Sequence, residues 1–536
     1  MNGVRWAALV FGLAIVWFGA GLGRCGIAST YCDPLSLIPA QDDAVYAREA
    51  IDTASNGNWL TPTFMGRFVL NKPPLLQILT AASLKLFGIS SWALRVPSLV
   101  AAALVSALVF LLVWRSCSLL VALGAAFLLF TNRLFYVFSR LCMTDMLLVL
   151  WTTLAMLVLA ADPALLRKRS VWLLGIYTAA AVLTKAAAGF LPLIALAVHA
   201  LLAGPKSRPS FSRRAGVFGV TLMFAAPWHL YQLATHFKWF VAEYLLTAHF
   251  AVGMAAPPQY SNECHPVFYA RRLFWMDPVL TLVAGLGLVL AVAGWRRNTI
   301  VLAWMAAAAF ALLGFRYRSG YYLLSAIPAL AVLAGNALGW LSPRARAAVA
   351  ALLLAGGIVK VASGASVWGV PLAAESHRPA VPALERYCEQ GRGNGLIMVS
   401  PDDEFYAADL PLAGLRYCFQ LRQPQAPPID WGWLGIWLRV RDFNRLAELA
   451  PVYRRRLDSF GLHSDAPIAT VIWAETPAEV AELVQAHPET DFSMPEELWK
   501  RIGGAGSHLP LRVSPGRVFL LSNSASRIHV ARPCRF

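Results

Sequence analysis

Two adjacent carboxylates and a lysine thirty residues later form the first group of side chains that could do chemistry. Asp42 and Asp43 stand in the stretch PAQDDAVYA, and Lys72 stands in NKPP. Neighbouring carboxylates could deprotonate a hydroxyl or hold a divalent cation, and a lysine could bind a phosphate as a point charge. The acidic pair could instead form an Asx-type turn that caps a surface helix beginning near Asp43. Both interpretations stay open on spacing alone.

A second group lies between two apolar segments, in the stretch SRLCMTD over residues 139–145. An acidic residue at the edge of a membrane span is energetically costly and is a functional candidate by default. Asp145 could also be the N-cap of a helix over 146–161, with Arg140 reaching toward the membrane interface. The two interpretations are compatible.

Further cations and a histidine are scattered along the chain. Lys185 follows Leu-Thr, His265 lies in ECHP, and Arg318 precedes Ser-Gly-Tyr-Tyr322. Single residues of these kinds are more often structural. Together they would form a cationic basin suited to an anionic lipid head group.

The elements that must position these residues are membrane spans. The chain has 536 residues, of which 58% are hydrophobic and 14% charged, whereas soluble domains carry roughly 25% charged residues. This composition excludes a soluble globular protein and a disordered one. The sequence predicts an all-α polytopic membrane domain of about 11 transmembrane helices, because a span needs about 20 apolar residues. The predicted spans are 5–23, 93–114, 118–137, 146–161, 171–184, 188–203, 215–232, 278–294, 299–315, 321–340 and 347–368.

Two segments decide this topology. One helix over 171–203 would be about 50 Å long at 1.5 Å per residue, and Lys185, Gly189 and Pro192 interrupt it, so we expect two short helices. The run 73–88 is short and carries polar residues, and we expect it to lie on the membrane surface.

The charge distribution supports a cytoplasmic N-terminus. The predicted cytoplasmic connections hold 12 Lys and Arg in 33 residues, and the outer ones hold 12 in 130 residues with nine acids. Lys and Arg collect on the cytoplasmic side of membrane proteins. The net charge of +17 is therefore largely a topology signal, and no nucleic-acid partner is needed to explain it.

Composition changes after about residue 370. Charge rises, Pro and Gly recur, and short β-like runs appear at 396–400, 433–440, 469–473 and 518–521, between helix-like stretches at 442–449 and 477–486. We predict a membrane domain over 1–370, with outer loops 24–92 (carrying juxtamembrane helices) and 233–277, and an extracytoplasmic α/β domain over 371–536. Seven of the eight cysteines fall on the outer side, where disulfides persist, and Cys25–Cys32 and, more weakly, Cys388–Cys418 are candidate pairs.

Eight short motifs in order resemble a known family. They are DDxxYA, NWLxP, KPPL, LFGxSxxxLRxPS, SRxxxTDM, LTKxxxG, HPxFY and RxxxYLLxxIPAL, all before residue 370. This series is similar to bacterial glycosyltransferases of the GT-C fold, in particular the lipid A aminoarabinose transferases and the protein O-mannosyltransferase superfamily (glycosyltransferase families 39 and 83).

The resemblance implies inverting transfer of a sugar from a polyprenyl-phosphate donor to a glycolipid, glycan or protein acceptor, at the outer face of a bacterial cytoplasmic (inner) membrane. It makes Asp42 the base or acceptor-orienting residue and Asp145 the second required acid. It assigns donor-phosphate binding and acceptor or substrate binding to further matching positions. The implied phosphate ligands are Lys72, Arg318, Arg140 and Lys185, and the implied acceptor or substrate contacts are Asp43, Tyr46, Tyr322 and His265.

One departure from the family pattern concerns a metal and another concerns the donor phosphate. Some relatives bind a metal with a glutamate immediately before the lysine and with the loop histidine, whereas this chain has Asn71, a weaker ligand. No cofactor is certain, and a divalent metal would have Asp43 and His265 as weak candidate ligands. Arg318 stands where the family usually has lysine and favours a bidentate phosphate contact.

Two other functions remain as alternatives to the transferase. A transporter or flippase for lipid-linked sugars would carry polar residues at mid-membrane and internal inverted symmetry, whereas the polar residues here cluster on one predicted face. A non-catalytic envelope assembly protein is supported only by the C-terminal domain.

Overall fold

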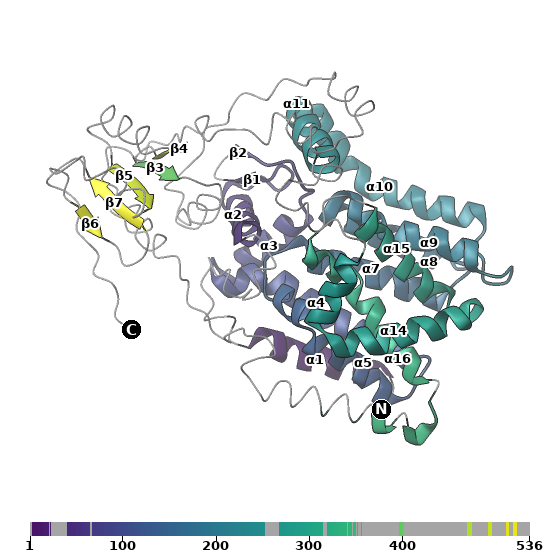
Figure 1. Cartoon of the computed structure of the whole chain (residues 1–536). Coiled ribbons are helices and arrows are strands. Elements are labelled where there is room, and N and C mark those ends of the chain that lie inside the picture. Colours follow the sequence, from purple (N-terminus) through teal and green to yellow (C-terminus); the bar gives the residue numbers. More distant parts are fainter. Residues whose placement is uncertain are drawn as a thin grey trace.

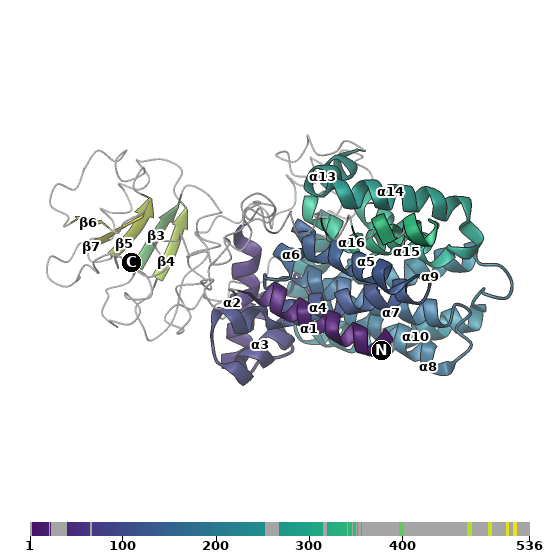
Figure 2. The same cartoon turned by 90° about the horizontal axis from the view of Figure 1, so that it is seen from below.

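The computed structural model describes residues 3–20, 22, 40–64, 67–251, 267–314, 319–339, 341–345, 347–349, 351, 355 and five short strands between 396 and 522. For some residues inside these elements, among them Asp42, only the backbone is described. The described part is mostly helical (Figures 1 and 2). Helices occupy ten of the eleven predicted spans, and the eleventh lies mostly outside the described residues.

The first half of the helical bundle is built on α4 (Ser91–Trp114). Helices α1 (Gly3–Gly19), α5 (Leu119–Thr131) and α7 (Thr144–Ala161) pack on it, and Figures 1 and 2 show α1, α4 and α5 side by side. A short helix, α6 (Arg133–Phe138), joins α5 to the stretch before α7. The shared core is made of alanine, leucine, valine and phenylalanine side chains, as expected where helices pack closely within a membrane.

The segment 171–203 is broken, as its sequence predicts. Helix α8 (Lys168–Lys185) ends at a 3₁₀ turn, η3 (Ala186–Phe190), and α9 (Leu191–Leu202) follows with Pro192 in its first turn. Ala186 has φ +47° and ψ −121°, a conformation that an L-residue rarely adopts. A Cβ on Gly189 would lie 2.2 Å from the backbone N of Val182, so only glycine fits where the turn folds back onto α8.

The remaining long helices complete the bundle. They are α10 (Phe211–Thr235), α13 (Phe268–Met276), α14 (Pro278–Ala293), α15 (Thr299–Leu313) and α16 (Ile327–Gly339), with the 3₁₀ turns η6 (Trp295–Arg297) and η7 (Gly320–Ser325) between them. Helix α10 packs on α8, α15 on α9, and α14 on α16. The predicted span 321–340 therefore begins as the 3₁₀ turn η7, and α16 is shorter than expected.

Smaller elements lie between the long helices. Helix α2 (Ala40–Asn56) packs on α3 (Leu75–Phe87), and α3 packs on α4. The two-residue strands β1 (Thr63–Phe64) and β2 (Arg67–Phe68) pair antiparallel between α2 and α3. A one-turn helix, α11 (Phe237–Trp239), leads into the π-helix η4 (Phe240–Ala251). The predicted surface helix near Asp43 thus begins at Ala40.

Length and exposure of the helices both fit a membrane. Within the described residues, three helical segments are long and apolar enough to cross a bilayer, namely Trp92–Trp114, Thr144–Ala161 and Lys168–Leu202, and six further apolar helices are shorter. Large apolar side chains such as Phe218, Leu222, Leu282 and Val289 are 43–65% exposed on α10 and α14. Exposed apolar surface of this extent marks contact with lipid or another apolar phase.

The described C-terminal strands form one five-stranded sheet in the order β4-β3-β5-β7-β6. Strand β3 (Leu396–Ser400) runs parallel to both β4 (Ala469–Trp473) and β5 (Asp491–Pro495). Strand β7 (Val518–Ser522) runs antiparallel to β5 and to β6 (Leu511–Val513). Three of the four predicted β-runs coincide with described strands. The fourth, 433–440, and the helix-like stretches 442–449 and 477–486 lie outside the described residues.

Candidate active site

Charged and polar side chains from five separate elements meet at one cavity of about 160 Å³. Lys72 comes from the turn before α3, Asp145 from α7, Lys185 from α8, His249 from η4, and Tyr322 from η7. The rest of the lining is Ser325 and apolar side chains contributed by the η3 turn, α7, α9, α15 and η4. The cavity therefore combines cationic groups with an apolar wall.

Asp145 and Lys185 form an ion pair in this lining. Lys185 Nζ lies 2.5 Å from Asp145 Oδ1, and the two side chains are 14% and 6% exposed respectively. Asp145 lies in the first turn of α7 and Lys185 in the last turn of α8, the ends at which the helix dipoles favour an anion and a cation. The helix begins at Thr144 with Met143 as its N-cap, so the prediction that Asp145 is the N-cap was wrong.

Two tyrosines face the same lysine. Lys185 Nζ lies 5.1 Å from the ring centre of Tyr322 and 5.6 Å from that of Tyr321, within the range of a cation–π contact. The unusual backbone of Ala186 follows Lys185 directly. The lysine is thus held from three sides: by an acid, by two rings and by the end of its own helix.

Asp43 has protein partners. Its Oδ1 accepts a hydrogen bond of 2.6 Å from the Cys142 N–H, and its Oδ2 lies 3.4 Å from Arg95 Nη2. Burial raises the pKa of Asp43, and Arg95 and the Cys142 N–H oppose that rise. Burial, with Asp43 nearby, also raises the pKa of the Cys142 thiol. The structure therefore places Asp43 on α2 in contact with the stretch that leads to Asp145, and not among the residues that line the cavity.

Arg140 also faces the protein. Its guanidinium donates hydrogen bonds of 2.8 and 2.6 Å to the carbonyls of Phe18 and Ala20 and lies 5.3 Å from the ring centre of Tyr136. Cations at a helix C-terminus satisfy carbonyls that have no partner within the helix. Arg140 thus fixes the end of α1, and its side chain, fully buried, is not among those lining the cavity. The expected reach toward the membrane interface is not observed.

The other predicted site residues divide into two groups. Tyr46 is buried and belongs to the main hydrophobic core. The side chain of Asp42 and the whole of His265 and Arg318 lie outside the described residues, as do both candidate cysteine pairs.

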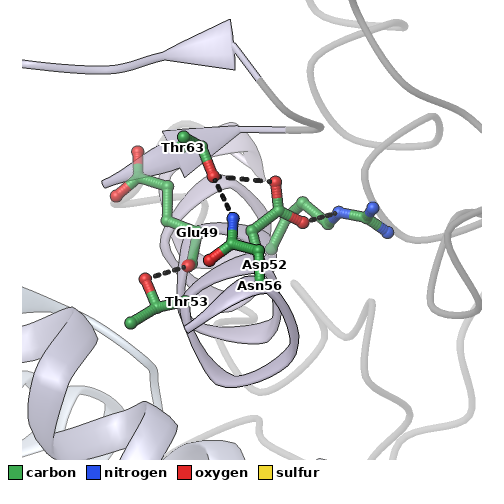
Figure 3. Close-up of polar contacts among 6 residues, drawn as sticks. Glu49, Asp52, Thr53, Asn56 and Thr63 are labelled. Atoms are coloured by element: carbon green, nitrogen blue, oxygen red, sulfur yellow. Dashed lines mark hydrogen bonds and ion pairs between the residues drawn. The ribbon is translucent and has the colours of Figure 1, made fainter. Parts of the chain in front are cut away.

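A buried polar cluster along α2 was not predicted (Figure 3). Arg48 Nε lies 2.7 Å from Asp52 Oδ1, and the Thr63 hydroxyl lies 3.4 Å from Asp52 Oδ2. The Asn56 amide donates to Thr63 Oγ1 at 3.1 Å, and the carboxylate of Glu49 accepts a hydrogen bond from the side-chain amide of Gln77 on α3. The i, i+4 spacing of Arg48 and Asp52 is the sequence signal that could have indicated this cluster.

His249 is the cavity residue that sequence reasoning missed. Its Nδ1 hydrogen-bonds the main-chain carbonyl of Tyr244. Burial lowers the pKa of His249, the Tyr244 carbonyl acts in the opposite direction, and Lys72 and His229 lower the pKa further. No motif marks this position, because it lies in an apolar stretch of the loop 233–277.

The described residues contain no group of three or more His, Cys, Asp or Glu side chains placed to hold a metal ion. Of the two candidate metal ligands, Asp43 is engaged by Cys142 and Arg95. The donor set that the structure describes therefore does not fit a metal site.

Comparisons with known proteins agree with the fold. Residues 71–231 match the family model of dolichyl-phosphate-mannose-protein mannosyltransferases, a range that contains Lys72, Asp145 and Lys185. An uncharacterized protein of Aquifex aeolicus is 28% identical over 206 residues, which span 38% of this chain and 41% of that relative.

Two solved structures resemble the whole chain. ArnT from Cupriavidus metallidurans bound to undecaprenyl phosphate has a TM-score of 0.67 at 17% identity, over 98% of this chain and 99% of that one. The oligosaccharyltransferase of Archaeoglobus fulgidus has a TM-score of 0.53 at 13% identity, over 97% of this chain and 74% of that one. The predicted resemblance is confirmed: the chain has the GT-C fold and resembles ArnT and the protein mannosyltransferases.

Proposed function

We propose that this chain is an integral membrane glycosyltransferase that moves a sugar from a polyprenyl-phosphate donor to an acceptor hydroxyl or phosphate, with inversion at the anomeric carbon. The cavity carries the proposal. Lys72 and the Lys185–Asp145 pair, beside apolar side chains of α9 and α15, match a ligand with an anionic head and a hydrocarbon tail. Undecaprenyl phosphate, present in the structure of ArnT, is such a ligand.

The cations of the cavity would act on the leaving phosphate. As the sugar–phosphate bond breaks, negative charge grows on the phosphate oxygen, and preorganised donors aimed at that charge supply the largest part of the stabilisation in reactions of this kind. Lys72 and Lys185 are the described groups suited to this task, and Arg318 is assigned to the same task by its position in the sequence motif. Tyr322 would orient Lys185 through its ring.

Asp42 would take the acceptor proton or orient the acceptor. Its neighbour Asp43 is anchored to the Cys142 N–H, so the start of α2 is fixed relative to the stretch that carries Asp145. A carboxylate on a fixed helix can approach an acceptor hydroxyl with little reorganisation. Asp43 would then be a positioning residue, which holds the start of α2 and with it Asp42 in place.

The proposed topology has eleven spans in a bacterial inner membrane, with a cytoplasmic N-terminus and an extracytoplasmic domain over 371–536. It places Lys72, Asp145, Lys185 and Tyr322, which meet at the cavity, on the outer side. The donor would arrive in the bilayer, and a glycolipid, glycan or protein acceptor would arrive from outside.

The test is release of free polyprenyl phosphate by the purified full-length protein from a panel of polyprenyl-phosphate pentoses and hexoses. We expect release from at least one donor, and a loss of about 10²-fold or more in Asp42→Asn, the scale of general base catalysis. Asp162→Asn, in the predicted cytoplasmic loop 162–170, is the matched control and should retain activity. Absence of release from every bound donor would overturn the transferase, and full activity in Asp42→Asn would overturn the role of that acid.

A further inference from the structure

His249 is held in one orientation by its own helix. Its Nδ1 bonds the carbonyl of Tyr244, and the two rings lie 4.5 Å apart between centroids. Tyr244 is fixed in turn, because its hydroxyl lies 2.7 Å from His229 Nε2 and its ring stacks on Phe240 at 4.6 Å. The imidazole therefore meets the cavity as a preorganised group.

This arrangement determines which ring nitrogen carries the proton. A carbonyl oxygen can only accept a hydrogen bond, so Nδ1 of His249 must be the N–H donor. In the neutral ring, Nε2 is then a bare acceptor, and it becomes a donor only when the ring takes up a second proton. Among the described residues, the structure records a hydrogen bond for His249 at Nδ1 alone.

The charged and titratable groups around His249 come from every neighbouring element. Lys72 precedes α3, Asp145 and Lys185 form their ion pair on α7 and α8, Tyr322 lies on η7, and the bonded pair His229 and Tyr244 lies on α10 and η4. Burial, Lys72 and His229 keep the pKa of His249 below its ordinary value. At neutral pH, before a phosphate binds, the imidazole is therefore uncharged.

The charge of a transferred phosphate changes during the proposed reaction. The sugar donor is a phosphate diester with one negative charge, and the leaving polyprenyl phosphate is a monoester with a second pKa near 6, so it carries close to two. Of the described lining residues with fixed charge, Lys72 and Lys185 are positive and Asp145 is negative. That sum balances the diester, and the monoester adds one further negative charge to the described lining. Arg318, which the motif assigns to the same phosphate, is not part of this sum because it lies outside the described residues.

We propose that Nε2 of His249 is a ligand of the leaving phosphate, and that the ring takes up one proton when the cavity holds polyprenyl monophosphate. This inference rests on the proposed function. The bond between the anomeric carbon and the phosphate oxygen breaks, and its electron pair stays on phosphate. The acceptor oxygen bonds to the anomeric carbon, and its proton goes to the carboxylate proposed for that role. The proton on His249 comes from solvent and returns there when the product leaves.

The experiment measures the Kd of a water-soluble, short-chain polyprenyl monophosphate for the full-length protein between pH 7 and pH 9.5. His249→Asn is the informative variant, since its amide keeps a donor near the position of Nδ1 but has nothing at Nε2. His236→Asn is the matched control, because His236 contacts the Thr61 hydroxyl and is not among the residues lining the cavity.

We expect the ratio of the Kd of His249→Asn to that of wild type to be near one at pH 9.5. At pH 7 it should rise to about tenfold, which corresponds to about 1.4 kcal/mol of binding free energy. The ionisation of the phosphate itself is common to both proteins and cancels in the ratio. His236→Asn should keep the wild-type curve, and His249→Lys, with a permanent cation, should bind tightly at both pH values.

The outcomes separate the inference from the function. Parallel pH curves for wild type and His249→Asn, with weakened binding in Lys72→Met, would overturn the role of His249 and leave the transferase standing. A wild-type protein that fails to bind polyprenyl phosphate at any pH would overturn both.

Discussion

The cluster on α2 and the cavity contain the same kinds of side chain under opposite conditions. On α2, Arg48, Glu49 and Asp52 are at most 1% exposed. Gln77 and Thr63 donate hydrogen bonds to the two carboxylates. At the cavity, Lys72 and His249 are partly buried and border open volume. The comparison teaches that burial and charge do not identify a binding site by themselves. What distinguishes the cavity is that its cations border a space that a ligand can fill.

The largest expected effect concerns the buried cluster on α2. Asp52→Ala leaves Arg48 buried without this partner, and breaking such a pair costs about 3–5 kcal/mol. We expect a lower thermal unfolding midpoint in detergent, with the turnover per folded molecule retained. The double variant Arg48→Met with Asp52→Leu, which removes both charges, should recover part of the loss. Equal stability of the single variant and wild type would show that the cluster contributes nothing to the fold.

The next largest effect concerns the cavity. Lys72→Met should lower turnover by about 10²–10³-fold, the scale on which single electrostatic donors contribute to catalysis, with an unchanged unfolding midpoint. Lys85→Met is the matched control, because Lys85 is exposed in the last turn of α3 and should retain full activity. A lowered unfolding midpoint with unchanged turnover would show that Lys72 stabilises the fold and does not act on the phosphate.

Arg140 sharpens the comparison, because the family resemblance makes it a phosphate ligand and the structure makes it an anchor for α1. Arg140→Met removes the hydrogen bonds that this side chain donates to Phe18 and Ala20, a net loss of about 2 kcal/mol. It should lower the unfolding midpoint by less than Asp52→Ala does and leave the KM for the donor unchanged. Steady-state kinetics of the purified variant check this. A raised KM for the donor with normal stability would return Arg140 to the phosphate site.

Asp162 lies in the predicted cytoplasmic loop 162–170 and should show the smallest effect. Its carboxylate accepts hydrogen bonds from the N–H groups of Leu166 and Arg167, and although burial opposes it, these bonds lower its pKa. The stability it supplies is therefore present above the unfolded pKa and lost as pH falls through the lower, folded pKa. Asp162→Ala should cost about 1 kcal/mol at pH 7, and this cost should shrink as pH falls through the folded pKa. Chemical denaturation at a series of pH values measures it.

Residue types and spacing predicted much of this molecule. Apolar runs of span length predicted helices at ten of the eleven spans, and Lys185, Gly189 and Pro192 predicted the break between the fifth and sixth spans. Lys72, Asp145, Lys185 and Tyr322, predicted as site residues, do meet at one cavity. The helix positions could be predicted because they depend on local sequence, and the roles of the four cavity residues stay predictions.

The missed features depend on contacts between distant segments. Asp43 and Arg140 have the residue types of ligands, but Cys142 and Phe18, about a hundred residues away in sequence, take up their hydrogen bonds. His249 has no motif around it and joins the cavity only because η4 brings it beside Lys72. The periodicity and composition of a sequence do not reveal such contacts between distant segments.

Ala186 has a consequence for how the chain directs Lys185. Its backbone conformation costs of the order of 1–3 kcal/mol for a residue with a side chain, and glycine would adopt it at little expense. The methyl group leaves the turn fewer ways to rotate than glycine would. The backbone directly after Lys185 is therefore more rigid than a glycine would make it. This rigidity restricts the directions in which the lysine side chain can point, at a cost in conformational free energy.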